Sequence, residues 1–267
     1  IENKDQKQNL VSTNIYKTVQ NIYEVYKILK EKSFKRGCLN LNVPEKKFVF
    51  NKKNFPVGIE HVKNLESYNI IEEFMVLANF CAAEEITQND QNNVYRIHEK
   101  PSTDKINYLI KTLGNPYQNV LRNNFSTIAL NTILEKEKKE TSFNFLSQII
   151  LRTQSQAKYD NINKGHFGLA LKKYVHFTSP IRRYSDLLVH RKLSKIIDKD
   201  FSKKDPDNDE LKLICKHISS TERIAIEAER KTFDRMRALL FSKNIKKEFN
   251  GSIVSVKKFG VFVSFNQ

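Results

Sequence analysis

Segments with apolar residues at helical spacing dominate this sequence of 267 residues. In residues 10–32, apolar side chains recur every three or four positions, which predicts a helix with one apolar face. Residues 67–86 are apolar almost all round, so we expect that helix to be buried. The same spacing predicts further helices at 102–113, 122–138, 143–158, 180–198, 207–218 and 220–245. Ser219 and Glu222 have capping-box spacing, which predicts a break between the last two.

Short strands accompany these helices. Residues 47–50 and 57–63 predict two strands joined by a turn that contains Asn, Pro and Gly. Residues 93–98 alternate like a strand, and 251–265 alternate like two strands around a turn. Two strands alone are marginally stable, so we expect the chain to end inside a small β-domain. The expected fold class is α/β, mostly helical in this region.

The chain is strongly basic, with a formal net charge of +16 and a pI near 9.6. This charge favours a polyanionic partner, nucleic acid first and an anionic membrane second. The sequence is also rich in Lys, Asn and Ile, as AT-biased coding would produce. A solvated lysine surface is therefore the alternative explanation of the charge.

Three widely separated cysteines, Cys38, Cys81 and Cys215, form no CxxC pair. Their spacing argues against a disulfide framework or a zinc site and favours a reducing, cytoplasmic location. The six histidines include no pair at i, i+4 spacing, so we expect no metal site within this chain. No run of 18 or more apolar residues predicts a membrane span. The sequence begins at Ile1 without a leader, and we expect a piece of a longer protein.

HFTSPIRRYSDLLVH at residues 176–190 places two arginines, an aspartate and two histidines around a Ser-Pro pair. Ser179 is a good helix cap and Pro180 suits the first helical position, so we expect the helix to begin there. An apolar face would then comprise Ile181, Tyr184 and Leu188. The polar side chains fall on a different arc, namely Arg182, Arg183, Asp186 and His190.

Arg182 would lie in the first turn of this helix, where unpaired backbone N–H groups already carry partial positive charge. A cation at this position is explained if an anion such as phosphate docks there. Asp186, one turn further on, is expected to orient the Arg182 guanidinium. A surface ladder of salt bridges explains the same residues, and they do not decide between the two interpretations.

Three further features come from the residues alone. Gly165 and Gly168 predict a loop with special backbone geometry. Glu72 lies in the apolar segment and shares a helix face with Asn79, which predicts a polar cavity; a Glu72 that reaches solvent is the alternative. Residues 205–210 (DPDNDE) faintly resemble a calcium loop, but the glycine and the final acid that such a loop needs are missing. A solvated helix start explains them better.

YVHFTSPIRRYSDLLVHR at 174–191 closely resembles the signature of the RNB family, the ribonuclease II and ribonuclease R exoribonucleases. Other segments resemble the family in family order: IIEEFMVLANFCAA (70–83), VYRIHEKPS (94–102), GHFGLAL (165–171) and TERIAIEAER (221–230). FNGSIVSVKKFGVFV (249–263) resembles the start of an OB-type RNA-binding barrel. RGCLNLNVPEKKFVFN (36–51) favours the ribonuclease R branch. We therefore expect the C-terminal part of an RNB catalytic domain over 1–246 and a truncated OB-type hairpin over 247–267.

The resemblance implies a hydrolytic, processive 3′→5′ exoribonuclease that binds single-stranded RNA, releases nucleoside 5′-monophosphates and uses Mg²⁺. It implies no membrane and no obligate protein partner. By resemblance, Arg182 contacts the phosphate near the scissile bond and Glu72 lines the pocket for the 3′-terminal nucleotides, so both are expected to be catalytic. The other residues expected to bind RNA are Glu229, Arg183, His176, Thr178, Ser179, His166, Phe259 and Phe262.

Two departures from the family pattern qualify this expectation. The family's metal-binding aspartates lie upstream of the matching segments, and IENKDQKQNL at the start of this sequence contains only Asp5. We therefore expect the Mg²⁺ ligands upstream of this chain and no nuclease activity from this chain alone. Leu41 occupies the place of an aromatic residue that stacks on the last base in some members. The alternatives are an inactive RNA-binding or scaffold protein with this fold, and a helical interaction protein without an RNA role.

Overall fold

The structure is a computed structural model. It describes residues 13–41, 46–62, 64–89, 92–115, 117–138, 143–199, 206–242 and 247–265. The chain divides into two compact units, which are described separately. Unit 1 comprises Ile1–Val43 and Asn64–Thr221, and unit 2 comprises Pro44–Lys63 and Glu222–Gln267. The expected domain boundary after residue 246 stays a prediction.

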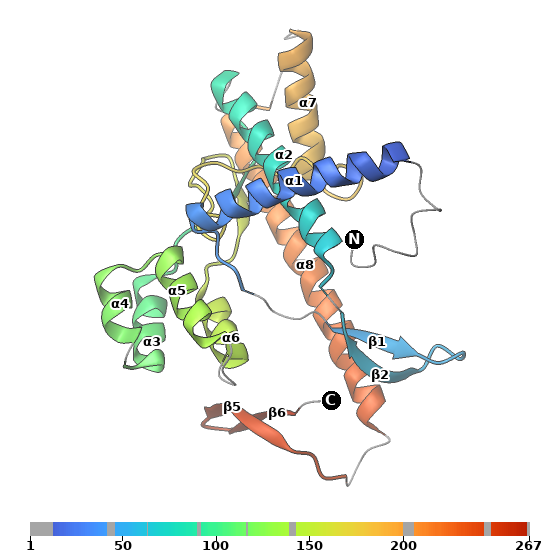
Figure 1. The fold of residues 1–267 in the computed structure, drawn as a ribbon, viewed down its shortest axis with the longest axis vertical. Coiled ribbons are helices and arrows are strands. Elements are labelled where there is room, and N and C mark those ends of the chain that lie inside the picture. The colour runs from blue at the N-terminus through green and yellow to red at the C-terminus, as the bar shows by residue number, and fades with distance from the viewer. Residues whose placement is uncertain are drawn as a thin grey trace. The chain divides into compact units, whose positions relative to one another are not determined.

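Unit 1 is mostly helical (Figure 1). Its elements are α1 (Thr13–Arg36), α2 (Glu66–Asn89), β3 (Tyr95–Ile97), α3 (Thr103–Leu113), α4 (Tyr117–Asn123), α5 (Thr127–Glu137), α6 (Phe143–Thr153), β4 (Lys158–Asp160), α7 (Tyr184–Asp198) and the first part of α8 (Asn208–Phe241). The helices expected at 10–32 and 102–113 are thereby confirmed as α1 and α3. Within the described residues, no helix is both long and apolar enough to cross a membrane.

Helices α3 to α6 form a small bundle with its own core (Figure 1). The buried side chains of this core include Leu109, Leu121, Leu130, Ile133 and Ile150. Their burial on four short helices explains why this bundle is stable, because helices of this length are marginal without tertiary packing.

Two further cores surround the β3–β4 ribbon. One joins α2, β3 and α7 and contains Ala83, Ile86, Ile97, Val175 and Val189. The other joins β4 to the start of α8 and contains Val94, Tyr159, Leu211, Cys215 and Ile218. The ribbon therefore ties α2, α7 and the start of α8 into one unit.

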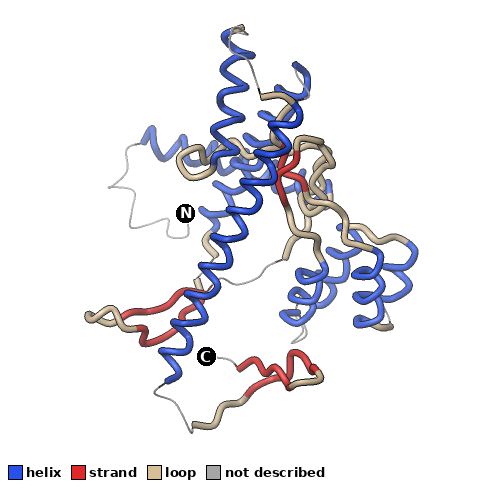
Figure 2. The backbone as a smooth tube through the Cα atoms, turned by 180° about the vertical axis from the view of Figure 1, so that it is seen from behind, coloured by secondary structure: helices blue, strands red, loops and turns tan. Residues whose placement is uncertain are grey.

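Strands β3 and β4 are antiparallel, with Arg96 opposite Tyr159. Figure 2 shows this short red ribbon among the long loops of unit 1. The loop after β4 returns to β3: the Arg96 N–H donates to the Tyr174 carbonyl at 2.9 Å, and the His98 N–H donates to the Gly165 carbonyl at 3.0 Å. These two bonds fix the start of the segment that leads into α7.

The glycine loop has the special geometry that the sequence predicts. Gly165 has φ +71°, and a Cβ atom there would lie 3.1 Å from the Leu171 carbonyl oxygen. A Cβ atom on Gly168 would lie 2.9 Å from His98 Nδ1, which is closer than real Cβ atoms approach. Gly168 thus permits close contact between the loop and the His98 ring.

Unit 2 contains two antiparallel hairpins and the second part of α8. The first hairpin pairs β1 (Lys46–Phe50) with β2 (Pro56–His61), and the second pairs β5 (Gly251–Lys257) with β6 (Gly260–Phe265). Phe48 packs on Phe233 of α8, with ring centroids 4.5 Å apart. Both hairpins are confirmed as pairs of strands; the OB-type character of the second stays a prediction.

Two expected helix boundaries in the α4–α6 region are wrong. Residues 122–138 do not form one helix, because the Ser126 side chain accepts a hydrogen bond from the Ala129 N–H at 3.2 Å and caps a new helix, α5. The helix expected to reach residue 158 ends at Thr153, because residues 158–160 pair with β3.

Two expectations about the long helices are also wrong. The break expected at Ser219 is absent from α8, because the Ser219 hydroxyl accepts a hydrogen bond from the Tyr159 N–H at 2.9 Å and so anchors β4. Helix α2 is not buried all round: its buried face includes Asn79 and Ile86, whereas Ile71 is 58% exposed.

The start of α8 is a capped helix terminus. This is the interpretation that the sequence favoured over a calcium loop. The Asp207 carboxylate accepts the Asp209 and Glu210 N–H groups at 3.0 and 2.9 Å, and the Asp207 N–H donates to the Glu210 carboxylate at 3.1 Å. These reciprocal bonds form a capping box and satisfy backbone donors that the helix leaves unpaired.

Asp207→Ala is expected to lower the free energy of unfolding by about 1 kcal/mol, because it removes the cap. Asp209→Ala is the matched control, since the Asp209 carboxylate makes no hydrogen bond or ion pair with the described residues. Its loss is expected to cost less than about 0.5 kcal/mol. Urea unfolding followed by circular dichroism checks both values. Equal losses from the two substitutions would contradict the capping role.

Candidate nucleic-acid interface

The HFTSPIRRYSDLLVH segment is a loop followed by a helix that begins later than expected. Helix α7 starts at Tyr184, with Arg183 as its N-cap residue in extended conformation (φ −124°, ψ 119°). Pro180 lies in a turn instead. The Arg182 and Arg183 N–H groups close this turn by donating to the Ser179 carbonyl at 3.3 and 3.1 Å. The prediction that Ser179 caps a helix beginning at Pro180 is therefore wrong.

The Asp186 carboxylate fixes this turn. Its side chain is fully buried, and its Oδ1 atom accepts the Ser179 N–H at 2.8 Å and the Arg183 guanidinium at 2.7 Å. Its Oδ2 atom accepts the Ser185 hydroxyl at 2.9 Å. A buried carboxylate needs such donors to offset its desolvation. The expectation that Asp186 orients Arg182 is wrong, because the chain bends before the helix and brings Arg183 to the carboxylate.

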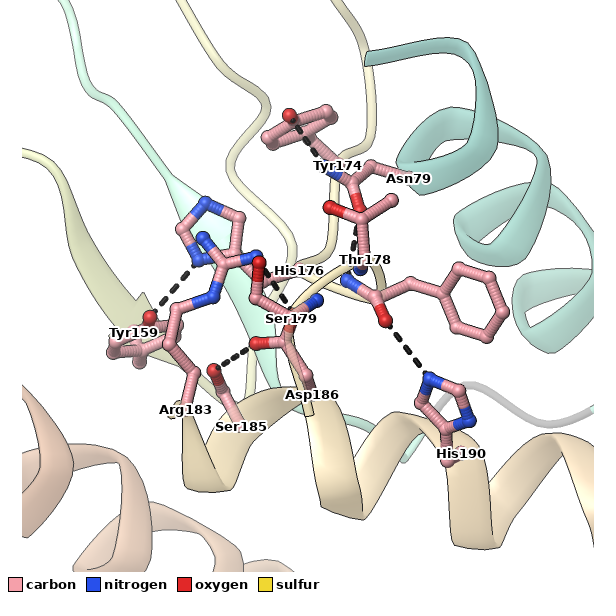
Figure 3. Close-up of polar contacts among 11 residues, drawn as sticks. Asn79, Tyr159, Tyr174, His176, Thr178, Ser179, Arg183, Ser185, Asp186 and His190 are labelled. Atoms are coloured by element: carbon pink, nitrogen blue, oxygen red, sulfur yellow. Dashed lines mark hydrogen bonds and ion pairs between the residues drawn. The ribbon is translucent and has the colours of Figure 1, made fainter. Parts of the chain in front are cut away.

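The buried side-chain amide of Asn79 holds residues 177 and 178, which precede the turn, from the side of helix α2 (Figure 3). Asn79 of α2 is 3% exposed, and its Oδ1 atom accepts the Phe177 and Thr178 N–H groups at 2.7 and 3.2 Å. Its Nδ2 group donates to the Tyr174 hydroxyl at 2.9 Å. Three consecutive backbone N–H groups, at residues 177–179, therefore donate to side chains of α2 and α7.

Helix α7 makes one more contact with this loop. His190 Nε2 lies 2.8 Å from the Phe177 carbonyl oxygen, which accepts its hydrogen bond. The two rings also stack, with centroids 4.3 Å apart and an interplanar angle of 14°. We refer to Asn79, Asp186 and His190 as the loop clamp.

The clamped turn exposes Arg182. This side chain is exposed and makes no hydrogen bond or ion pair with the residues that the structure describes. Its neighbour Ile181 is 102% exposed and Tyr184 is 48% exposed, so the expected apolar face of Ile181, Tyr184 and Leu188 is wrong. Because residues 180–182 are not helical, only Leu188 of the three packs against a core.

Glu72 of α2 is exposed, so the expected cavity lined by Glu72 and Asn79 is wrong. The two side chains do share one helix face, but the loop covers Asn79 and forms hydrogen bonds with both its amide oxygen and its amide nitrogen. Glu73, the next residue, is the half-buried carboxyl, and burial raises its pKa.

The two histidines expected at the RNA site lie in an aromatic cluster beneath the loop. The Tyr159 hydroxyl shares a hydrogen bond with His176 Nδ1 at 2.9 Å. The Tyr174 ring contacts both His166 and His176, with centroid distances of 5.3 and 5.8 Å. His166 Nδ1 also accepts the Leu169 N–H at 3.2 Å. These bonds give His166 and His176 a structural role in supporting the loop.

This cluster keeps its histidines neutral. Burial lowers the pKa of His166 to about 3, with further contributions from His98 and Arg96. Burial, together with the charges of Arg183 and Arg96, lowers the pKa of His176 to about 2. His98 Nδ1 accepts the Gly168 N–H at 2.9 Å, a bond that a protonated ring could not accept.

The remaining expected RNA contacts belong to unit 2. Glu229 is exposed on α8. Phe259 and Phe262 are 83% and 51% exposed on the second hairpin, and their rings meet edge to face with centroids 6.1 Å apart. Phe259 lies in the turn of this hairpin and Phe262 on β6, and exposed aromatic rings are able to stack on bases.

The described residues contain no group of three or more His, Cys, Asp or Glu side chains that could bind a metal ion. The donor set present in this part of the chain therefore does not fit Mg²⁺, which prefers several converging oxygen ligands. Cys38, Cys81 and Cys215 are unpaired.

Sequence reasoning missed some residues that build this interface. Tyr159 and Tyr174 carried no signal, because nothing in the sequence indicates which tyrosines meet a histidine. Asn79 did carry a sequence signal, since an amide within an apolar helix needs hydrogen-bond partners when it is buried. The partners themselves lie 95 or more positions away in the sequence.

Comparisons with known proteins agree with this picture. A family model described as the RNB domain matches residues 1–199. Ribonuclease R 1 of Lactococcus lactis subsp. lactis is 34% identical over 255 residues, which cover 92% of this chain and 31% of that protein. The structure of Mycoplasma genitalium RNase R in complex with ribose-methylated single-stranded RNA matches with a TM-score of 0.89 at 29% identity, covering 99% of this chain and 42% of that one.

A third match is the structure of yeast Ssd1, described as a pseudonuclease. Its TM-score is 0.50 at 25% identity, and the match covers 58% of this chain and 20% of that one.

The helical unit with its short strands and clamped loop has the fold of an RNB domain. The chain belongs to the RNB-domain family, as its resemblance implied, and its fold is that of ribonuclease R structures. It spans about a third of the length of the Lactococcus relative, at 31%.

The neutral histidines predict that stability falls in mild acid. In the unfolded chain a histidine binds its proton near pH 6.5, whereas folded His166 and His176 resist protonation down to about pH 3 and 2. The unfolded state therefore binds more protons below pH 6.5, and the free energy of unfolding decreases as the pH falls. From pH 7 to 5, we expect a loss on the order of 2 kcal/mol for each of the two.

His176→Gln is expected to reduce the slope of unfolding free energy against pH between pH 5 and 6 by about one proton. Ser220→Ala, which replaces an exposed side chain of α8 that does not titrate, is the control and is expected to leave the slope unchanged. Urea unfolding at a series of pH values measures the slope. A slope that His176→Gln does not change would show that this histidine titrates equally in both states.

Proposed function

We propose that this chain is part of a hydrolytic 3′→5′ exoribonuclease that binds single-stranded RNA and processively releases nucleoside 5′-monophosphates. One observation carries the proposal: the family signature presents an exposed arginine, Arg182, on a turn whose backbone is fixed from two helices. Family membership supports it. We propose this activity for a longer protein that contains this chain, which spans 31% of the Lactococcus relative.

Arg182 is proposed to bind the phosphate near the scissile bond. Its guanidinium is able to donate two parallel hydrogen bonds to phosphate oxygens. The charge that develops on these oxygens in the transition state strengthens the bonds. Arg183 differs from Arg182 because Asp186 already neutralises its charge. The proposed contact of Arg183 with RNA is therefore weaker than that of Arg182.

The other proposed contacts surround this turn or lie in unit 2. Glu72 is proposed to face the 3′-terminal nucleotides, and its exposure on α2 leaves it open to such a ligand. Thr178 and Ser179 contribute their loop, whose N–H groups are already used by the clamp. His166 and His176 are proposed to line the site from below. Glu229, Phe259 and Phe262 are proposed to contact RNA from unit 2.

Mg²⁺ is proposed as the cofactor, with ligands from parts of the longer protein outside this chain. This chain alone is then expected to lack nuclease activity. A cytoplasmic location stays a prediction.

An inactive RNA-binding protein is the second candidate. The similarity to the structure of yeast Ssd1, described as a pseudonuclease, favours it. Mg²⁺-dependent release of mononucleotides by the longer protein would separate the two candidates.

Arg182→Ala in the longer protein is expected to lower turnover about 100-fold, the typical loss when one transition-state donor is removed. RNA affinity is expected to change less than about fivefold, because one phosphate contact among many is removed. Arg191→Ala removes an equal charge from an exposed position on α7 and is the control. Steady-state hydrolysis and equilibrium binding measure both effects, and unchanged turnover would exclude Arg182 from the mechanism.

A further inference from the structure

The loop that carries Arg182 owes its shape to side chains. Residues 174–183 contain no helix or strand in the described structure. The N–H groups of residues 177–179 donate to Asn79 and Asp186 and to no backbone carbonyl. Backbone donors that are satisfied in this way have one favourable arrangement, set by the position of the acceptor side chain.

The two acceptors belong to different helices and have different tasks. Asp186 is the third residue of α7 and closes a local contact with Ser179 and Arg183. Asn79 lies about 95 or more residues away in the sequence and connects the loop to α2. Only Asn79, of these two, fixes the loop relative to a separate helix.

Helix α2 also carries Glu72. Glu72 and Asn79 are seven residues apart on one helix face, which corresponds to about 10 Å along the axis. A rigid helix keeps that separation constant. The position of Asn79 therefore relates the Arg182 turn to the Glu72 carboxylate.

We propose that Asn79 is a positioning residue, which fastens the Arg182 turn to α2 and so sets the spacing between the guanidinium of Arg182 and the carboxylate of Glu72. This inference rests on the proposed function, since Asn79 acts through Arg182. Asn79 itself is only 3% exposed and is covered by the loop, so it is not proposed as an RNA contact.

The amide group of Asn79 suits this task for a chemical reason. One oxygen accepts two N–H groups while the nitrogen donates to the Tyr174 hydroxyl. An aspartate at this position keeps the acceptor oxygen, and the Tyr174 hydroxyl is then able to donate to the second oxygen. Leucine has a similar size and makes none of the three bonds. These two substitutions separate the hydrogen bonds from the packing.

A double-mutant cycle on hydrolysis by the longer protein tests the proposal. Asn79→Leu is expected to lower kcat at least about tenfold, with KM changed less than about threefold, because a 1 Å displacement of a positioned group is sufficient for a large loss. Once Arg182→Ala is present, Asn79→Leu is expected to lower kcat less than about twofold, because the residue that Asn79 positions is gone. Asn79→Asp is expected to restore most of the rate.

Controls keep the outcomes distinct. Asn89→Ala removes an exposed α2 amide whose hydrogen bonds among the described residues lie within its own helix, and it is expected to leave kcat unchanged. If Asn79→Leu does not fold, Tyr174→Phe removes one clamp bond with minimal change of volume and enters the cycle in its place. Losses from Asn79→Leu and Arg182→Ala that multiply independently would overturn the positioning role. An Arg182→Ala protein with full activity would overturn the proposed function itself, and with it this role.

Discussion

The buried acceptors of the loop clamp are the interaction on which the interface depends. Residues 177–179 lie between the β3–β4 ribbon and α7 and have no strand or helix to receive their N–H groups. Asn79 and Asp186 accept all three, from opposite sides. A buried carboxylate without donors would be strongly unfavourable, but the same donors that fix the loop satisfy Asp186. The same hydrogen bonds therefore satisfy the buried Asp186 carboxylate and fix the shape of the loop.

This requirement separates the two adjacent arginines. Arg183 turns inward to Asp186, and its side chain is only 19% exposed, whereas Arg182 remains exposed. The aromatic cluster that supports the loop adds no positive charge next to the two arginines, because its histidines are neutral and accept or share hydrogen bonds. Of the two consecutive arginines, Arg182 thus stays exposed, whereas Arg183 helps to build the turn.

Much of this arrangement was predictable from the sequence, and the errors have identifiable causes. Helical spacing located α1 and α3, and Gly165 indicated its left-handed backbone. The start of α7 was predicted too early because Ser179 and Pro180 satisfy the local rules for a helix start, whereas Asp186 draws the Ser179 N–H away from a helical conformation. The break at Ser219 was predicted from the capping-box spacing of Ser219 and Glu222. It is absent because the Ser219 hydroxyl accepts the N–H of Tyr159, 60 residues away. Local patterns cannot reveal a long-range partner that competes for the same atom.

Backbone hydrogen exchange of this chain, followed by NMR, tests the central claim most directly. The amides of Phe177, Thr178 and Ser179 are expected to be protected to the same degree as those in the middle of α7, because buried side chains accept their hydrogen bonds. Protection at least about 100-fold above an unstructured chain is the predicted result. Exchange of these three amides at the rate of an exposed loop would contradict the claim that Asn79 and Asp186 fix the turn that presents Arg182.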